Sequence, residues 1–137
     1  MNQIPLRYML DTNIVIHVIK RRPIELVDTF NHHHGRLAIS SITLAELLYG
    51  AEKSLHQAKN LKTIEDFTSR LQVISYDSAA AAHYGQIRAL LEEKGTLIGP
   101  NDLHIAAHAR SRGMTLVSNN LREFKRVPGL LQENWIM

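Results

Sequence analysis

The chain has 137 residues, no cysteine and a formal net charge of +3, from 16 lysines and arginines against 13 aspartates and glutamates. This length is typical of one domain, and we expect a single domain over residues 1–137. Without cysteine there are no disulfides and no thiolate ligands, so any metal must be bound by oxygen or imidazole. The modest basic excess is compatible with a nucleic-acid partner but does not establish one.

No apolar stretch approaches the roughly 18 residues of a membrane span. The N-terminal sequence MNQIPLRYML also lacks the features of a secretion signal. We therefore expect a cytoplasmic protein with no membrane partner.

Short apolar runs alternate with amphipathic segments along the chain. The expected strands are 8–10, 37–39, 72–76, 115–117 and 130–135. The expected helices are 14–20, 24–31, one within 41–54, 58–71, one from 77 or 78 to 94, one from 101 or 102 to about 112, and a single turn at 121–124. This alternation predicts an α/β fold in which a mostly parallel central β-sheet is flanked by α-helices.

One acidic residue, Asp11, follows a buried strand in the stretch YMLDTNIVI. A carboxylate in apolar surroundings is costly to desolvate unless it is paired, hydrogen-bonded or bound to a cation. In an open α/β sheet, ligands bind at the carboxyl ends of the strands. The alternative is that Asp11 only caps the helix that begins near Ile14.

Two further acids lie in apolar surroundings. In SITLAELLYGAEKS, Ile42, Ala45 and Tyr49 form one stripe of a helix that we expect to be largely buried, and Glu46 lies inside it. In GPNDLHIAAHARSRG, Asp102 shares a stripe with small and apolar residues. Each acid has an ordinary alternative, which is a solvated helix edge for Glu46 and a helix cap for Asp102.

Two histidine patterns are similar to metal sites without fitting one. Adjacent helix positions point about 100° apart, so the tract 32–34 cannot grip one ion, and we expect a solvated helix end closed by Gly35. His104 and His108 have the spacing of zinc-binding helices, but HIAAH lacks the glutamate of HExxH. Both rings also project away from the stripe that Asp102 shares.

If the three acids have no common role, a separate cap or solvated edge must explain each of them. Three such coincidences are less probable than one, which favours a common role. If the parallel sheet brings Asp11, Glu46 and Asp102 together, their carboxylates repel one another unless a divalent cation lies among them. Oxygen ligands suit Mg²⁺ or Mn²⁺, which support phosphodiester hydrolysis. Without these acids the remaining chain carries 16 − 10 = +6. An acidic centre with a basic surround predicts a polyanionic substrate.

Four motifs in order resemble those of the PIN-domain ribonucleases and, among them, the VapC toxins of bacterial toxin–antitoxin pairs. The motifs are YMLDTNIVI, SSITLAELLYGAEKS, IGPNDLHIAAHARSRG and LVSNNLREF. The resemblance implies an α/β PIN domain in which Asp11, Glu46 and Asp102 bind Mg²⁺ or Mn²⁺ and the enzyme cuts RNA, thereby inhibiting translation. It also implies a VapB-type antitoxin that blocks the site, a homodimer, and operator DNA bound only through the antitoxin complex. Initiator tRNA, cut in the anticodon loop, is the leading candidate substrate.

The family's fourth site position falls on Asn120, with Ser118 as its hydroxyl and Phe124 as its aromatic residue. Many relatives carry aspartate there, so the neutral Asn120 predicts a weaker second metal site and one bound metal at rest. The candidate substrate contacts are Thr12, Ser118, Arg21 and Arg22. The two arginines can equally be ordinary helix-end charges.

Two other functions fit part of the pattern. A phosphatase with Asp11 as covalent nucleophile usually needs a second aspartate two residues later, where this chain has Asn13. A nucleic-acid-binding module without activity would gain from losing carboxylates that repel phosphate. The nuclease interpretation accounts for all three acids and is therefore favoured.

Overall fold

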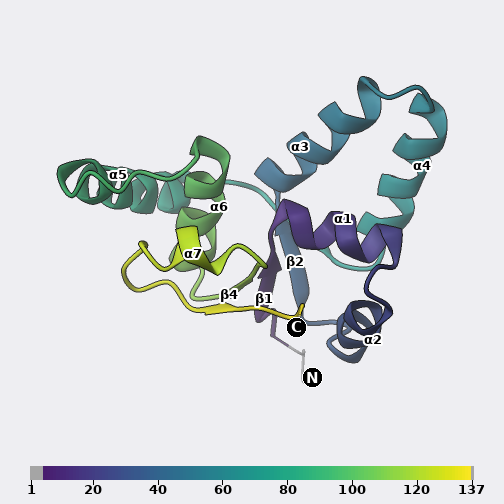
Figure 1. Ribbon diagram of the computed structural model, residues 1–137, viewed down its shortest axis with the longest axis horizontal. Helices are drawn as coiled ribbons and strands as arrows, with labels where there is room; N and C mark the ends of the chain where they lie inside the picture. The colour runs from purple at the N-terminus through teal and green to yellow at the C-terminus, as the bar shows by residue number, and fades with distance from the viewer. Residues whose placement is uncertain (1–4, 137) are drawn as a thin grey trace.

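The computed structural model describes residues 5–136, and Figure 1 shows its helices arranged around one β-sheet. Residues 1–4 and 137 of the predicted domain lie outside the described residues. The first four residues of MNQIPLRYML, the segment that we expect to lack a secretion signal, therefore lie outside them too. Between residues 5 and 136, no helix is long and apolar enough to cross a membrane.

The sheet has five strands that are all parallel. They are β1 (Tyr8–Leu10), β2 (Leu37–Ser40), β3 (Gln72–Ile74), β4 (Thr115–Val117) and β5 (Gln132–Glu133), in the order β3-β2-β1-β4-β5. The predicted parallel sheet is thus confirmed, although β3 and β5 are shorter than expected. One reason is that the Tyr76 backbone N–H donates to Ser41 Oγ (3.0 Å) instead of extending the β3 ladder.

Seven helices connect and cover the strands in the described part of the chain. They are α1 (Thr12–Lys20), α2 (Ile24–His32), α3 (Ser41–Glu52), α4 (Gln57–Thr68), α5 (Ser78–Glu93), α6 (Pro100–Ser111) and α7 (Leu121–Phe124). All predicted helices are present, and the single turn at 121–124 has the predicted bounds, whereas most other helix ends are shifted by a few residues. Helix α6 begins at Pro100, before the predicted start, because proline suits the first turn of a helix.

The sheet separates two apolar cores, because successive strand residues point to opposite faces. Met9 and Leu116 pack with α5 and α6 on one face. Leu10 and Val117 pack with α1, α2, α3 and α4 on the other face. Figure 1 shows α5 and α6 on one side of the sheet and the α3–α4 hairpin on the other. The predicted flanking of the sheet by helices is confirmed.

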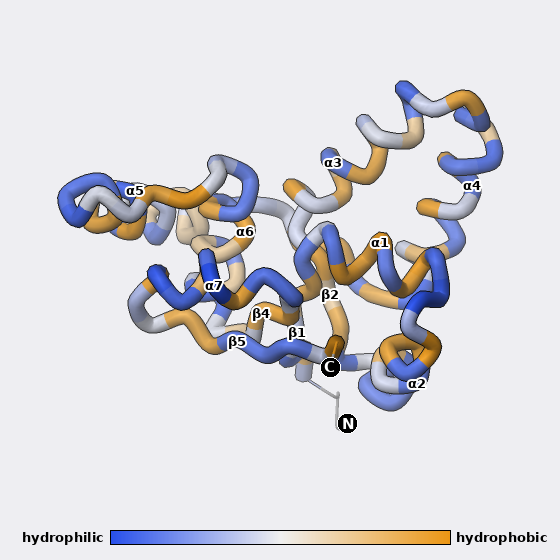
Figure 2. The backbone as a smooth tube through the Cα atoms, in the orientation of Figure 1, coloured by the Kyte–Doolittle hydropathy of each residue, from blue (hydrophilic) through white to orange (hydrophobic). Residues whose placement is uncertain are grey.

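Helix α3 is more exposed than predicted. Its buried residues are Thr43, Leu47 and Ala51, whereas Ala45 is exposed and Tyr49 is 65% exposed. The α3–α4 hairpin extends away from the sheet, so only one side of α3 is covered, and Figure 2 shows apolar residues at intervals up to its tip. The prediction of a largely buried α3 was therefore wrong.

The strand order places two strand ends side by side at the middle of the sheet. Strands β1 and β4 are neighbours, with Leu10 opposite Val117. The Asp11 N–H donates to the Val117 carbonyl oxygen (3.0 Å), which brings Asp11 next to Ser118. Strands β2 and β3 extend the sheet on one side of β1, and β4 and β5 extend it on the other side. Open α/β sheets bind ligands at such a switch in strand order.

Candidate active site

Asp11 is held between β1 and α1 and is only 3% exposed. Its Oδ1 accepts a hydrogen bond from the Ile14 N–H (2.9 Å), so Asp11 does cap α1. Burial raises the pKa of Asp11, hydrogen bonds from Ser118 and Ile14 lower it, and the charge of Glu46 raises it. The net direction is upward, so the cap alone does not compensate the buried charge.

Glu46 projects from α3 toward the same strand end. Its Oε1 accepts a hydrogen bond from Thr12 Oγ1 (2.6 Å), and its Oε2 accepts one from Asn101 Nδ2 (3.2 Å). These two bonds tie α3 to the first turns of α1 and α6. The side chain is half-buried and hydrogen-bonded rather than freely solvated, so the alternative of a solvated helix edge does not hold.

Asp102 lies in the first turn of α6 but is not its cap. Gly99 occupies the cap position, and no side chain caps this helix. Burial, a hydrogen bond with Glu123 and the charge of Glu123 raise the pKa of Asp102 to about 7, with smaller contributions from Asp11 and Glu46. The acids that the sequence separates by tens of residues are thus close enough to influence one another electrostatically.

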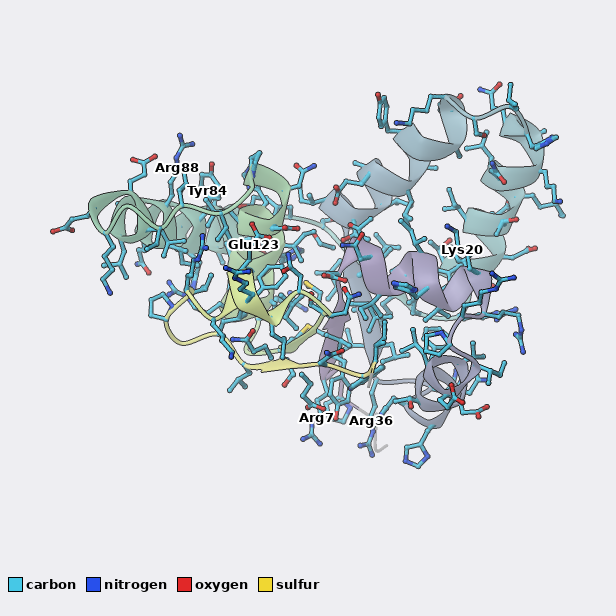
Figure 3. The ribbon with its side chains drawn as sticks, viewed as in Figure 1. Arg7, Lys20, Arg36, Tyr84, Arg88 and Glu123 are labelled. Atoms are coloured by element: carbon cyan, nitrogen blue, oxygen red, sulfur yellow. The ribbon has the colours of Figure 1, made fainter. Side chains whose placement is uncertain are left out.

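Glu123 is a fourth acid that the sequence reasoning missed. It lies on α7, where its Oε2 accepts a hydrogen bond from Asn120 Nδ2 (2.6 Å), and Figure 3 shows it beside α6. Its carboxyl group lies close enough to Asp102 to raise the pKa of Asp102. The spacing Asn120-x-x-Glu123, one helical turn, was the available signal. The weaker second metal site predicted from the neutral Asn120 stays a prediction.

Ser118 holds Asp11 and Asn120 in position by hydrogen bonds. It is fully buried, its Oγ accepts a hydrogen bond from the Asn120 N–H (2.8 Å), and it hydrogen-bonds the Asp11 carboxylate. A fully buried hydroxyl is not accessible to substrate, so Ser118 holds site residues instead of contacting RNA. Thr12 is half-buried and its hydroxyl is engaged by Glu46.

Ser118→Ala removes the hydroxyl, so the buried Asp11 carboxylate loses one of its hydrogen bonds and the Asn120 N–H loses its acceptor. We expect a loss of about 1–3 kcal/mol in the free energy of unfolding and a further rise in the pKa of Asp11. Urea denaturation measures the stability, with Ser69→Ala as the control, because Ser69 donates only to the Asp66 carbonyl on an exposed turn. Equal losses in both variants would contradict the positioning role.

Arg21 and Arg22 are not brought to the acid cluster. Both are exposed beyond the C-terminal end of α1, about 13 Å along the helix from Thr12. Figure 3 shows Lys20 at that end of α1, well away from Glu123. Arg21 instead lines a shallow cavity with Asp66 and Arg70 of α4 and the following turn. Direct contact of these arginines with the reacting phosphate is not supported.

The histidine patterns do not form a zinc site. His104 Nδ1 hydrogen-bonds Tyr76 OH (2.8 Å), whereas His108 Nδ1 hydrogen-bonds Ser40 Oγ (2.8 Å) in the core. In the tract 32–34, only the outer two rings are exposed, because His33 stacks on Trp135. The prediction of a fully solvated helix end was therefore wrong for His33.

The four acids offer only oxygen donors, which fits a hard divalent cation. Burial, with smaller contributions from neighbouring acids, raises the pKa of Asp11 and Asp102, and a bound cation would favour their charged forms. Within residues 5–136, no three acidic or histidine side chains already converge at metal-ligand spacing. Hydrogen bonds from Thr12, Asn101 and Asn120 fix the carboxylates of Glu46 and Glu123 in this conformation.

Known proteins share this sequence and this fold. A family model described as PIN domain matches residues 8–130. The chain is 60% identical over 131 residues to ribonuclease VapC2 of Haemophilus influenzae, covering 96% of this chain and 99% of that protein. It is 55% identical over 130 residues to tRNA(fMet)-specific endonuclease VapC of Salmonella typhimurium, covering 95% and 98%.

Solved structures agree with these sequence relatives. The crystal structure of DNA-bound VapBC from Salmonella typhimurium matches with a TM-score of 0.92 and 55% identity, covering 95% of this chain and 98% of that chain. The structure of VapBC2 from Rickettsia felis, bound to a DNA fragment from its promoter, matches with a TM-score of 0.90 and 43% identity, covering 95% and 99%. With a family model over most of its length and relatives of matching length and fold, the chain belongs to the PIN-domain family, within its group of VapC ribonucleases.

Proposed function

We propose that this protein is the toxin of a toxin–antitoxin pair and an endoribonuclease that cuts tRNA, with initiator tRNA as the first candidate, and thereby inhibits translation. The observation that carries this proposal is the cluster of Asp11, Glu46, Asp102 and Glu123 at the carboxyl ends of β1 and β4. The relatives named as a ribonuclease and as a tRNA(fMet)-specific endonuclease support the substrate class.

Nucleases of the PIN-domain family generally depend on a divalent metal. We propose Mg²⁺ or Mn²⁺, with Asp11, Glu46 and Asp102 as ligands and Glu123 as the fourth carboxylate. When bound, such an ion supplies a deprotonated water and offsets the charge that develops on phosphorus. Asp102, whose pKa is raised to about 7, must lose its proton before it can act as a ligand. Ser118, Thr12 and Asn101 keep the acids in place while the substrate binds.

An apolar cavity of about 330 Å³ between α1, α3 and α4 is the surface that we propose a VapB-type antitoxin covers. Its lining includes Ile16, Leu47 and Ile64, and it reaches Thr12 and Glu46 of the acid cluster. A segment that fills the cavity would therefore also block access to Glu46. The matched structures, which are VapBC complexes, support this partner.

Four further points belong to this proposal. We propose that the protein forms a homodimer and that operator DNA is bound only through the antitoxin complex. We also propose that residues 1–137 form one domain and that the protein acts in the cytoplasm.

Cleavage of total tRNA by the purified protein tests this function. We expect discrete products in Mg²⁺ or Mn²⁺ that disappear in EDTA, and sequencing their ends identifies the RNA and the bond cut. Intact tRNA under every metal condition would overturn the proposal and favour a binding module without activity. A phosphoaspartate trapped on Asp11 would instead favour a phosphatase, although a carboxylate that is 3% exposed is poorly placed as a nucleophile.

A further inference from the structure

A second group of charged and aromatic residues lies at the opposite end of the sheet, where β1 and β2 begin. We call it the basic–aromatic face and define it by Arg7, His32, His33, Arg36 and Trp135. Figure 3 shows Arg7 and Arg36 projecting from the same edge of the molecule, whereas Glu123 lies toward the other end of the strands. The function proposed above does not use these residues.

The two arginines are fixed next to each other by the backbone. The Arg7 N–H donates to the Arg36 carbonyl oxygen (2.9 Å), and both side chains are exposed. The Arg7 guanidinium lies 5.3 Å from the centre of the Tyr8 ring. Neither guanidinium forms an ion pair with an acidic side chain of residues 5–136. Two exposed, neighbouring positive charges are therefore available to an anion.

The aromatic part of the face is rigidly packed. His33 stacks on Trp135 with ring centres 4.9 Å apart and planes 19° apart, and Tyr8 packs against both rings. Trp135 remains partly exposed, and its Nε1 donates to Glu133 Oε1 (3.3 Å), the one acid that contacts this part of the face. Burial and the charge of His32 lower the pKa of His33, which favours the uncharged ring. A partly exposed indole on a fixed support is suited to stacking on a base.

We propose that the basic–aromatic face is a second RNA-contacting surface, on which Arg7 and Arg36 bind phosphates and Trp135 stacks on a base. Arginine pairs that contact phosphates beside an aromatic ring that stacks on bases are the chemistry of single-stranded RNA recognition. This inference rests on the proposed function, because it concerns how the same RNA substrate is held.

The position of the face predicts which RNAs it can bind during cleavage. Arg7 and Asp11 flank β1, so they lie about 13 Å apart along the strand. Because β1 is buried, the RNA must pass around the molecule, so a strand that rises about 3.4 Å per nucleotide must extend more than about four nucleotides beyond the cut bond. A folded tRNA meets this condition, and a short oligonucleotide centred on the bond does not.

Kinetics on a long and a short substrate separate the two surfaces. We compare Arg7→Gln/Arg36→Gln, the rescue variant Arg7→Lys/Arg36→Lys, and the control Lys59→Gln/Lys62→Gln, which removes two exposed charges from α4. For the tRNA that wild type cuts, the glutamine double variant should raise KM about tenfold and lower the salt slope by about 1.5, with little change in kcat. For a five-nucleotide RNA centred on the cut bond, kcat/KM should not change. The lysine variant should restore most of the affinity.

Trp135 is the only tryptophan of the chain, so its fluorescence reports this surface directly. In EDTA, adding tRNA to wild-type protein should quench the emission, and adding the five-nucleotide RNA should not. This binding measurement needs no cleavage, so it separates a failure of this inference from a failure of the proposed ribonuclease activity. Unchanged emission on adding tRNA would overturn the inference. So would an equal rise of KM in Arg7→Gln/Arg36→Gln and in the control Lys59→Gln/Lys62→Gln.

Discussion

Replacing Asp11 by asparagine should lower RNA cleavage by about a thousandfold or more while leaving the protein folded. The asparagine Oδ1 can still accept the hydrogen bond from the Ile14 N–H, so the cap of α1 is retained. The substitution removes the negative charge that burial disfavours, since the pKa of Asp11 is raised. The free energy of unfolding of the metal-free protein should therefore not fall.

Asp77→Asn is the matched control for this prediction. Asp77 caps α5 through the same kind of bond, from the Ala80 N–H to Oδ1 (3.0 Å), but it is not part of the acid cluster. Its pKa is lowered, mainly by that backbone hydrogen bond. We expect cleavage within about twofold of wild type in this variant. Comparable loss of cleavage in both variants would show that helix capping, and not the charge of Asp11, supports activity.

The metal-free protein should lose stability as the pH rises from about 5 to about 8, because of Asp102. Its pKa is about 7 in the folded protein and 3.8 without the fold. Between these values the folded state keeps a proton that the unfolded state has released, so stability falls as pH rises and levels off above about pH 7. Because Asp102 is only half-buried, we expect about 1 kcal/mol over this range.

Urea denaturation in EDTA at about pH 5 and pH 8, with wild type and Asp102→Asn, measures this dependence. The asparagine variant lacks the titrating carboxyl and should show a clearly smaller change. Saturating Mg²⁺ should stabilise wild type more at the higher pH, because a ligand carboxylate must be deprotonated. An identical pH dependence in wild type and Asp102→Asn would show that Asp102 is not the responsible group.

The fold was largely predictable from local patterns. Short apolar runs and capping residues mark each strand and helix, and a buried acid directly after a strand makes Asp11 a candidate site residue. These signals are local in the chain, so they survive without knowledge of packing. The burial of α3 was mispredicted because periodicity reveals an apolar face but not whether another element covers it, as Tyr49 shows.

The site was predictable only in part, for a related reason. Glu123 was missed because an acid in the first turn of a short helix has an ordinary role at the helix start, and its closeness to Asp102 depends on how α6 and α7 pack. Arg21 and Arg22 lie only ten and eleven residues from Asp11, yet a helix carries them away from it. His33 was taken as solvated because its partner, Trp135, comes from the far end of the chain.

Mn²⁺ binding, followed by electron paramagnetic resonance, tests most directly whether the acid cluster holds the cation. Wild type and Asp77→Asn should bind Mn²⁺ with the same affinity, and Asp11→Asn and Asp102→Asn should bind it at least about tenfold more weakly. Equal Mn²⁺ affinity in wild type, Asp11→Asn and Asp102→Asn would contradict a metal-dependent nuclease site at the ends of β1 and β4.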